Sequence, residues 1–196
     1  MKKAILLISL SLILIGCTTI PTNLSSIEKS DKARKYLEKN SMVFGRLVSD
    51  TQGYFLSLSA TNLKTRHKYT ITPPPRNQLF SKNKEDNRDG YYFSILPPGD
   101  YKVYLIGYSD GFYSGSVNVD MNFSVPEHSA TYLGTVIFSW EKTNNYLVYQ
   151  KGQVWYSVRD ESEDAIKRFW RRFPELKEDG LSVKTGLIEI EKSKNE

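Results

Sequence analysis

Hydrophobic and polar side chains alternate with a period of two along most of the chain after residue 41. In the segment 116–125, Val117, Val119, Met121 and Phe123 alternate with polar neighbours. Because successive side chains of a strand point to opposite faces, this segment predicts a strand with one buried and one solvated face. Similar patterns predict strands at 42–49, 54–61, 65–72, 91–96, 101–108, 131–140, 146–150, 153–158 and 181–190.

Turn residues separate the predicted strands. Pro98 and Gly99 suit the central pair of a type II turn, and Asp110-Gly111 is a strong hairpin signal. Lys151-Gly152 predicts the turn of a later hairpin, and the polar residues 76–90 predict a long loop. The strand at 131–140 is apolar on both faces, which favours a central position in a sheet.

Two segments have helical periodicity. Residues 25–40 carry only a thin apolar stripe, so we expect a weakly docked helix there. A second helix is predicted at about 161–173, because its apolar residues share one side and Pro174 follows it. Asp160 and Glu163 have the spacing of a capping box, with Asp in place of Ser or Thr. The apolar residues of this later helix are Ala165, Ile166, Phe169, Trp170 and Phe173.

The polar side of the later helix is rich in basic residues. The spacing predicts ion pairs of Glu163 with Lys167 and of Asp164 with Arg168. Arg171 and Arg172 are left without a local acidic partner. They could bind lipid phosphates or an acidic partner, and an ordinary solvated helix face is the alternative interpretation.

The middle of the chain resembles a known family of β domains. The strand Tyr91–Leu96, the turn Pro97–Asp100 and the returning strand from Tyr101 resemble the L-P-P-G-x-Y signature of prealbumin-like domains, such as carboxypeptidase regulatory-like and Cna-B-like domains. Val43–Val48 resembles their first strand, and the likeness covers roughly 42–140. It implies a mainly β, Ig-like or prealbumin-like antiparallel β-sandwich, with a short N-terminal helix and one late amphipathic helix. Such domains act as modules more often than as catalysts.

The first residues have the pattern of an export signal. Lys2 and Lys3 precede an apolar run that ends at Ile15, about a dozen residues long, within the roughly 7–15 of secretory signals. Leu14, Ile15, Gly16 and Cys17 resemble a bacterial lipobox, which implies cleavage between Gly16 and Cys17 and lipid attachment to the thiol of Cys17. An ordinary signal peptide, or an uncleaved anchor with an unrelated cysteine, is the alternative.

These patterns divide the chain into four parts. Residues 1–16 are the predicted signal peptide, 17–41 a lipidated tether with a short helix, 42–190 the β domain, and 191–196 a disordered tail. Cys17 is the only cysteine, so its acylation would leave no thiol for a disulfide. Removal of Lys2 and Lys3 lowers the formal net charge from +5 to +3. Export argues against nucleic acid as a partner.

Few residues suggest a chemical site. His67 lies between Arg66 and Lys68, and His128 has only sequence neighbours as acid and nucleophile, so neither predicts catalysis. No metal-ligand spacing appears, although Glu85, Asp86 and Asp89 could hold a cation loosely. Trp140, Trp155 and Trp170 could form a sugar-stacking platform. Of these, Trp155 is out of phase with its apolar neighbours and is therefore the one expected to be exposed.

The sequence thus predicts a non-enzymatic envelope lipoprotein without metal or cofactor. Its expected partners are the membrane, through the lipid, and another envelope protein or a cell-wall component. Thr18 follows the lipidated cysteine, and the absence of Asp at that position resembles outer-membrane sorting. The alternatives are a saccharide or cell-wall binder that uses exposed aromatics and, ranked last, a hydrolase.

Overall fold

The computed structural model describes residues 30–50, 55–73, 89–109, 114–145 and 150–190. Within these residues the fold is mainly β, with two five-stranded sheets and a few helices. Sheet A has the order β4-β1-β7-β8, with β9 also paired to β7; sheet B has the order β10-β6-β5-β2-β3. The strands of sheet A are β1 (Ser41–Ser49), β4 (Tyr91–Leu96), β7 (Ser129–Asn145), β8 (Gln150–Arg159) and β9 (Ser182–Thr185). Those of sheet B are β2 (Phe55–Asn62), β3 (Lys68–Ile71), β5 (Gly99–Ser109), β6 (Ser114–Val125) and β10 (Glu189–Ile190).

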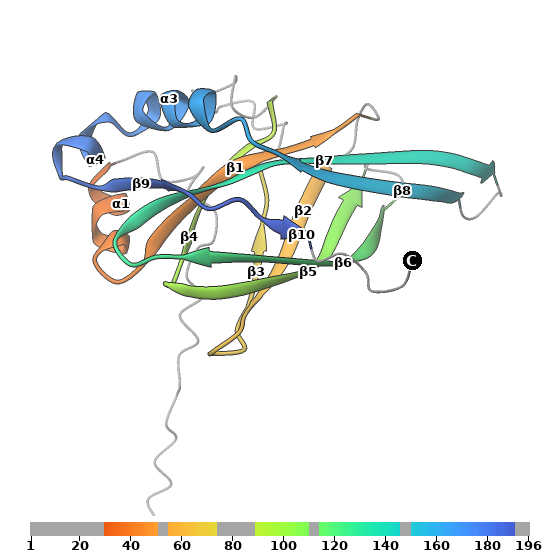
Figure 1. The fold of residues 1–196 in the computed structure, drawn as a ribbon, viewed down its shortest axis with the longest axis horizontal. Coiled ribbons are helices and arrows are strands. Elements are labelled where there is room, and N and C mark those ends of the chain that lie inside the picture. Colours follow the sequence, from red (N-terminus) through yellow and green to blue (C-terminus); the bar gives the residue numbers. More distant parts are fainter. Residues whose placement is uncertain (1–29, 51–54, 74–88, 110–113, 146–149, 191–196) are drawn as a thin grey trace, which may run out of the picture.

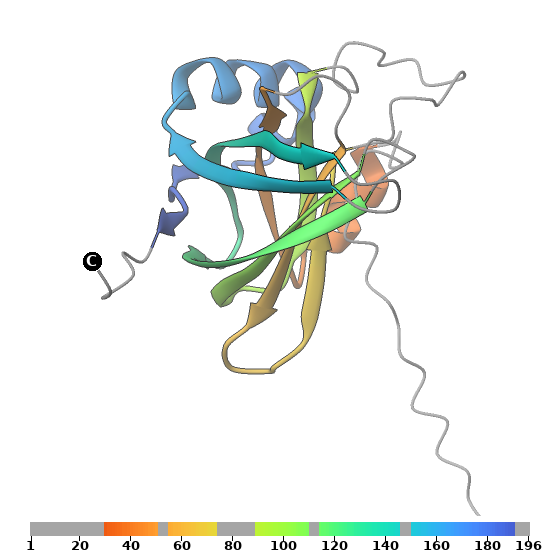
Figure 2. The same cartoon turned by 90° about the vertical axis from the view of Figure 1, so that its right-hand side faces the viewer.

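The molecule has three layers, with sheet A in the middle (Figures 1 and 2). One face of sheet A packs against sheet B through an inter-sheet core, in which Val103, Met121 and Phe138 are fully buried. The other face is partly covered by α1 (Ser30–Leu37), α3 (Ser162–Arg172) and α4 (Pro174–Glu178). The helical layer therefore gives sheet A a second core.

The second core is built on aromatic rings. Phe169 of α3 is fully buried, and its ring centroid lies 4.7 Å from that of Phe44 and 5.3 Å from that of Phe173. Phe93 of β4 lies 5.3 Å from Phe173. Burying large aromatic rings removes apolar area from water, and this holds the helix on the sheet.

A bulge in β7 lets this strand serve both cores. Tyr132 faces the helices, whereas Val136, an even number of residues later, faces sheet B. Gly134 lies between them with φ +100°, and the register with β1 shifts at the same place. An extra residue in a left-handed conformation reverses the alternation of side chains along the strand.

The returning strand is confirmed but begins earlier than predicted, since Gly99 and Asp100 of the expected turn already pair with β6. Tyr101 is fully buried, stacks on Phe123 at 5.0 Å and donates a hydrogen bond from its hydroxyl to the Pro97 carbonyl at 2.6 Å. Burial raises the pKa of Tyr101 to about 12. The Tyr101 ring is therefore part of the inter-sheet core.

Most strands confirm the predicted alternation, but the pairing differs from an antiparallel fold. β1 and β7 run parallel, as do β7 and β9, so sheet A is mixed. The single strand expected at 181–190 is wrong: β9 joins sheet A, and β10 joins sheet B. β3 is also shorter than the predicted 65–72.

The late hairpin also differs from its prediction. The turn at Lys151-Gly152 is wrong, because both residues pair with β7, on either side of a register shift of the ladder between Lys142 and Asn144. That ladder runs to Asn145 and Gln150, so the connection falls within 146–149, outside the described residues. The central position of β7 is confirmed, since it pairs with β1, β8 and β9.

The helices correct two expectations and add a third helix, α4. α1 is docked rather than loose, since Leu37 is buried in the second core and Arg34 pairs with Asp179 at 2.6 Å. Helix α3 is confirmed at Ser162–Arg172. The predicted capping box is wrong, because the N-cap is Glu161 and its side chain makes no cap bond, but the Asp160 carboxylate accepts a hydrogen bond from the Ser162 N–H at 2.9 Å. Pro174 ends α3 and also begins α4, where a missing N–H costs nothing.

Several sequence predictions lie outside the described residues. These are the signal peptide and lipobox, the tether, most of the 76–90 loop, the Asp110-Gly111 turn and the tail. Among the helices that the structure describes, none has the length and apolar character needed to cross a bilayer.

Candidate binding site

The helices leave part of the outer face of sheet A uncovered. Val154, Tyr156 and Val158 of β8 pack toward the inter-sheet core, so by alternation Trp155 points the other way. Trp155 is 48% exposed, the most exposed of the large hydrophobic residues that the structure describes. The sequence prediction of an outward Trp155 is confirmed.

Three strands bring an acid, a hydroxyl and an indole into one row. Ser139 of β7 and Trp155 of β8 are directly paired. The backbone N–H of Asp50 donates to the Phe138 carbonyl at 3.1 Å, which extends the β1–β7 ladder by one residue. The Asp50 carboxylate also accepts a short hydrogen bond from the Ser139 hydroxyl. The row therefore reads Asp50, Ser139, Trp155 across β1, β7 and β8.

A groove of about 420 Å³ opens at this row. Its lining residues are Asp50, Ser139, Trp140, Glu141 and Trp155. Beyond this point β7 and β8 continue past the end of β1 as a two-stranded ribbon (Figure 1). Strands β7 and β8 hold Ser139, Trp140, Glu141 and Trp155, and Asp50 directly follows β1, tied to β7 by its backbone N–H.

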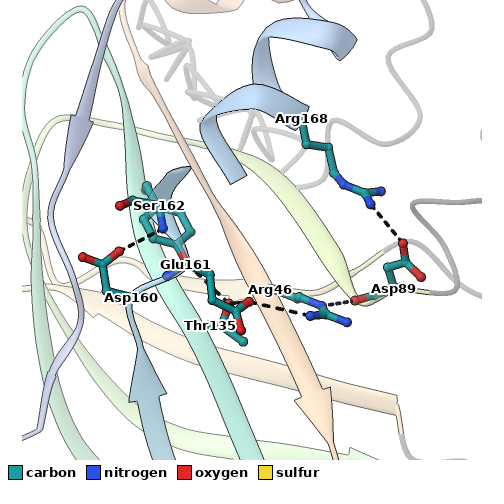
Figure 3. Close-up of polar contacts among 8 residues, drawn as sticks. Arg46, Asp89, Thr135, Asp160, Glu161, Ser162 and Arg168 are labelled. Carbon is teal, nitrogen blue, oxygen red and sulfur yellow. Dashed lines mark hydrogen bonds and ion pairs between the residues drawn. The ribbon is translucent and has the colours of Figure 1, made fainter. Parts of the chain in front are cut away.

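A band of charged contacts links β1 and β7 to the start of α3 (Figure 3). We call it the polar seam, and it comprises Arg46, Asp89, Thr135, Glu161 and Arg168. The Thr135 hydroxyl donates to Glu161 at 2.7 Å, and Arg46 lies 3.6 Å from the same carboxylate oxygen. Arg46 also donates to the Asp89 carbonyl at 2.7 Å, and Arg168 pairs with the Asp89 carboxylate at 3.1 Å.

Two tyrosines connect the polar seam to the second core. The guanidinium of Arg168 lies 4.3 Å from the ring centroid of Tyr91, and that of Arg46 lies 5.5 Å from it. Burial raises the pKa of Tyr91, and the two arginines oppose the rise. Burial likewise raises the pKa of Tyr132, whose hydroxyl accepts a hydrogen bond from the Glu161 N–H at 3.0 Å. In the polar seam two arginines are paired with two acids. Such paired charges suit a contact that holds α3 on the sheet better than they suit a ligand site.

The basic residues of α3 are used differently from their prediction. The Glu163–Lys167 pair is confirmed at 2.6 Å. The predicted partner of Arg168 is wrong, because this residue pairs with Asp89 instead of Asp164. Arg172 is not left unengaged: its guanidinium lies 5.1 Å from the Phe93 ring and 5.6 Å from the Phe173 ring. Arg171 is exposed, and a binding role of the two arginines stays a prediction.

The other predicted site residues are dispersed. Trp140 packs toward the inter-sheet core at 6.0 Å from Tyr108, while Trp170 lies in the second core, so the three tryptophans form no common platform. His67 and His128 are both exposed, and His128 has φ +48°. Cys17 and Gly16 lie outside the described residues, as do Glu85 and Asp86.

The described residues contain no group of three or more His, Cys, Asp or Glu side chains that could hold a metal ion. Sequence reasoning missed Asp50, Ser139 and Glu141. The alternation of β7 carried a signal for Ser139 and Glu141, as polar residues in an apolar strand. Nothing local pointed to Asp50, because its place follows from a parallel pairing between distant segments.

Comparisons with known proteins assign no family. No family model matches the chain, and no curated protein matches it. One similar solved structure is a leucine-rich repeat protein from Bacteroides thetaiotaomicron, with 12% identity and a TM-score of 0.32. The match covers 50% of this chain and 13% of the repeat protein, so this chain spans a small part of that protein's length.

Proposed function

We propose that this protein is a lipid-anchored module of the cell envelope, tethered to the outer membrane and serving a binding rather than a catalytic role. The lipobox-like segment Leu14–Cys17 supports the anchor. One acyl chain holds a protein to a bilayer only marginally, and two or more hold it firmly. The binding role is supported by one observation above all, the groove beside the exposed indole of Trp155.

We also propose that the two sheets form a prealbumin-like sandwich. The stacked sheets and the buried Tyr101 after the Pro97–Asp100 turn support this assignment. The parallel β1–β7 pair and the helical layer are departures that this chain adds to the pattern.

The first candidate partner for the binding role is another envelope protein. A saccharide or cell-wall ligand is the second, because an exposed tryptophan on a strand suits a sugar ring. A hydrolase is supported least. Among the described contacts, no hydrogen bond or ion pair joins His67 or His128 to an acidic side chain, so a nucleophile–base–acid set has no support there.

Replacement of the predicted lipid site tests the anchor. In the native host or a Gram-negative host, Cys17→Ser should leave the precursor uncleaved and without fatty acid, because a hydroxyl does not replace the thiol in this processing. Radiolabelled palmitate, gel mobility and membrane fractionation measure the three effects. Thr18→Ala is the matched control and should be labelled and cleaved like the wild type. Equal labelling of Cys17→Ser and wild type would refute the anchor.

A further inference from the structure

We infer that the groove at the end of β1, beside the middle of β7 and β8, binds a saccharide that carries no negative charge. The indole of Trp155 would stack on the C–H face of a pyranose ring. Asp50, Ser139 and Glu141 would hydrogen-bond to its hydroxyl groups. This inference rests on the proposed binding role and names its ligand class.

The shape of the site favours a flat ligand with an apolar face. Single exposed apolar residues are common on proteins and mean little alone. Here the indole borders a groove of about 420 Å³ and is held by pairing with Ser139 on a central strand. This volume is at the small end of the roughly 300–1,000 Å³ of small-molecule sites, which suits the end of a short oligosaccharide.

The polar groups of the site are mainly acceptors. Asp50 and Glu141 supply carboxylates. Ser139 supplies a hydroxyl that already donates its hydrogen bond to Asp50 and can therefore accept one from a ligand. These acceptors pair with hydrogen-bond donors of a ligand, and the hydroxyl groups of a sugar are such donors. Hydrogen bonds to carboxylates are shorter and stronger than neutral ones.

The charge of the lining also sets the specificity. The five described lining residues include two acids and no base. A uronic acid or sulfated sugar would bring like charges together, which disfavours its binding. Neutral sugars and amino sugars meet no such repulsion.

An organic ammonium ion is the main competing ligand, because carboxylates and an indole also attract cations. Recognition of such ions uses aromatic faces on several sides. Trp140, the other aromatic of the lining, packs toward Tyr108 and the inter-sheet core instead. Among the described lining residues, Trp155 thus offers the one open aromatic face, as a sugar ring requires.

Titration of detergent-solubilised full-length protein with defined oligosaccharides tests the inference. Calorimetry and tryptophan fluorescence measure the binding. Neutral and amino-sugar oligomers should bind, and a uronic acid oligomer of equal length should bind at least tenfold more weakly. Trp155→Ala should weaken binding at least tenfold, and Trp155→Phe should retain part of it. Glu141→Gln should reduce the discrimination against the uronic acid oligomer.

Leu63→Ala is the matched control, since it removes another exposed apolar side chain from the β2–β3 connection, away from the groove. It should leave affinity unchanged, and Trp155→Ala should retain the thermal unfolding midpoint. Unchanged binding in Trp155→Ala would overturn the inference. So would displacement of bound sugar by tetramethylammonium at similar concentration, or no binding of any oligosaccharide.

The outcomes separate this inference from the proposed anchoring. Loss of sugar binding with normal acylation of Cys17 would refute the saccharide site and leave the lipoprotein intact. If the wild-type protein from its host carried no lipid but bound the sugar, the anchor would be refuted and the saccharide site would stand.

Discussion

At the residue scale, Gly134 allows β7 to serve two cores. Its φ of +100° is disfavoured for other residues, and a Cβ at this position would lie 2.6 Å from Cγ1 of Val158. We predict that Gly134→Ala lowers the free energy of unfolding by about 2–4 kcal/mol, since backbone strain and overpacking act together. Urea denaturation followed by circular dichroism measures the loss.

Gly180 offers a matched control for this glycine. It also has positive φ, at +77°, but a Cβ there would meet nothing within 4 Å. Gly180→Ala should therefore cost only the conformational strain, about 1 kcal/mol. Equal losses in the two variants would mean that the packing against Val158 contributes nothing.

Some residues of the binding site could be predicted from sequence and others could not. The outward direction of Trp155 follows from the alternation of β8, which is a local property. The neighbourhood of Asp50 depends on the pairing of β1 with β7, two strands more than eighty residues apart in the sequence. A single sequence carries no signal for that pairing, and the parallel direction was opposite to the expectation.

At the element scale, α3 shows where local rules succeed and where tertiary contacts override them. The apolar spacing that predicted the helix is confirmed by the burial of Ala165, Phe169 and Phe173. The capping box fails because Glu161 occupies the N-cap position and its carboxylate accepts from Thr135 on β7. The Glu161 carboxylate thus binds the sheet, while the Asp160 carboxylate before it accepts from the Ser162 N–H of the helix.

This difference predicts unequal effects of two similar substitutions. Glu161→Gln removes the charge that Thr135 and Arg46 contact, and we expect a loss of about 1 kcal/mol in unfolding free energy. Glu163→Gln removes an exposed carboxylate whose pKa is lowered by its bond to Lys167, and we expect no measurable change in the unfolding midpoint. Urea midpoints at one protein concentration compare the two.

High salt provides the second readout. Contacts between exposed charges are screened by salt more than partly buried ones. The Glu161→Gln effect should therefore persist at about 1 M NaCl, where the Debye length falls to about 3 Å. An effect of Glu161→Gln that vanishes in salt would show that the polar seam acts only as a surface charge array.

At the scale of the whole molecule, the layers follow from sheet A having two apolar faces. The sequence predicted strands with buried faces and one good helix, and it did not predict that α1, α3 and α4 cover a sheet. The reason is that β4 is a short strand that is apolar except for Ser94 and buried throughout: Tyr92 faces one core, and Tyr91 and Phe93 face the other. Such a strand indicates burial on both sides without saying what lies on each.

Because the two cores share sheet A, we predict that the molecule unfolds as one cooperative unit. Phe169→Ala should remove about 3–5 kcal/mol from the second core. Since sheet A cannot remain ordered without both faces, β5 and β6 in sheet B should lose the same free energy of protection as α3. Hydrogen exchange measured by mass spectrometry, segment by segment, reports these free energies.

Leu63→Ala, at an exposed residue, is the control and should leave every segment unchanged. If Phe169→Ala reduced protection only in α3 and α4, the helices would open separately and the second core would be an addition to a self-sufficient pair of sheets. The shared strand β7 argues against that outcome, because its bulge at Gly134 places Tyr132 under the helices and Val136 against sheet B. If the helices detach from sheet A, β7 loses the packing of Tyr132 that helps to hold it in register against sheet B.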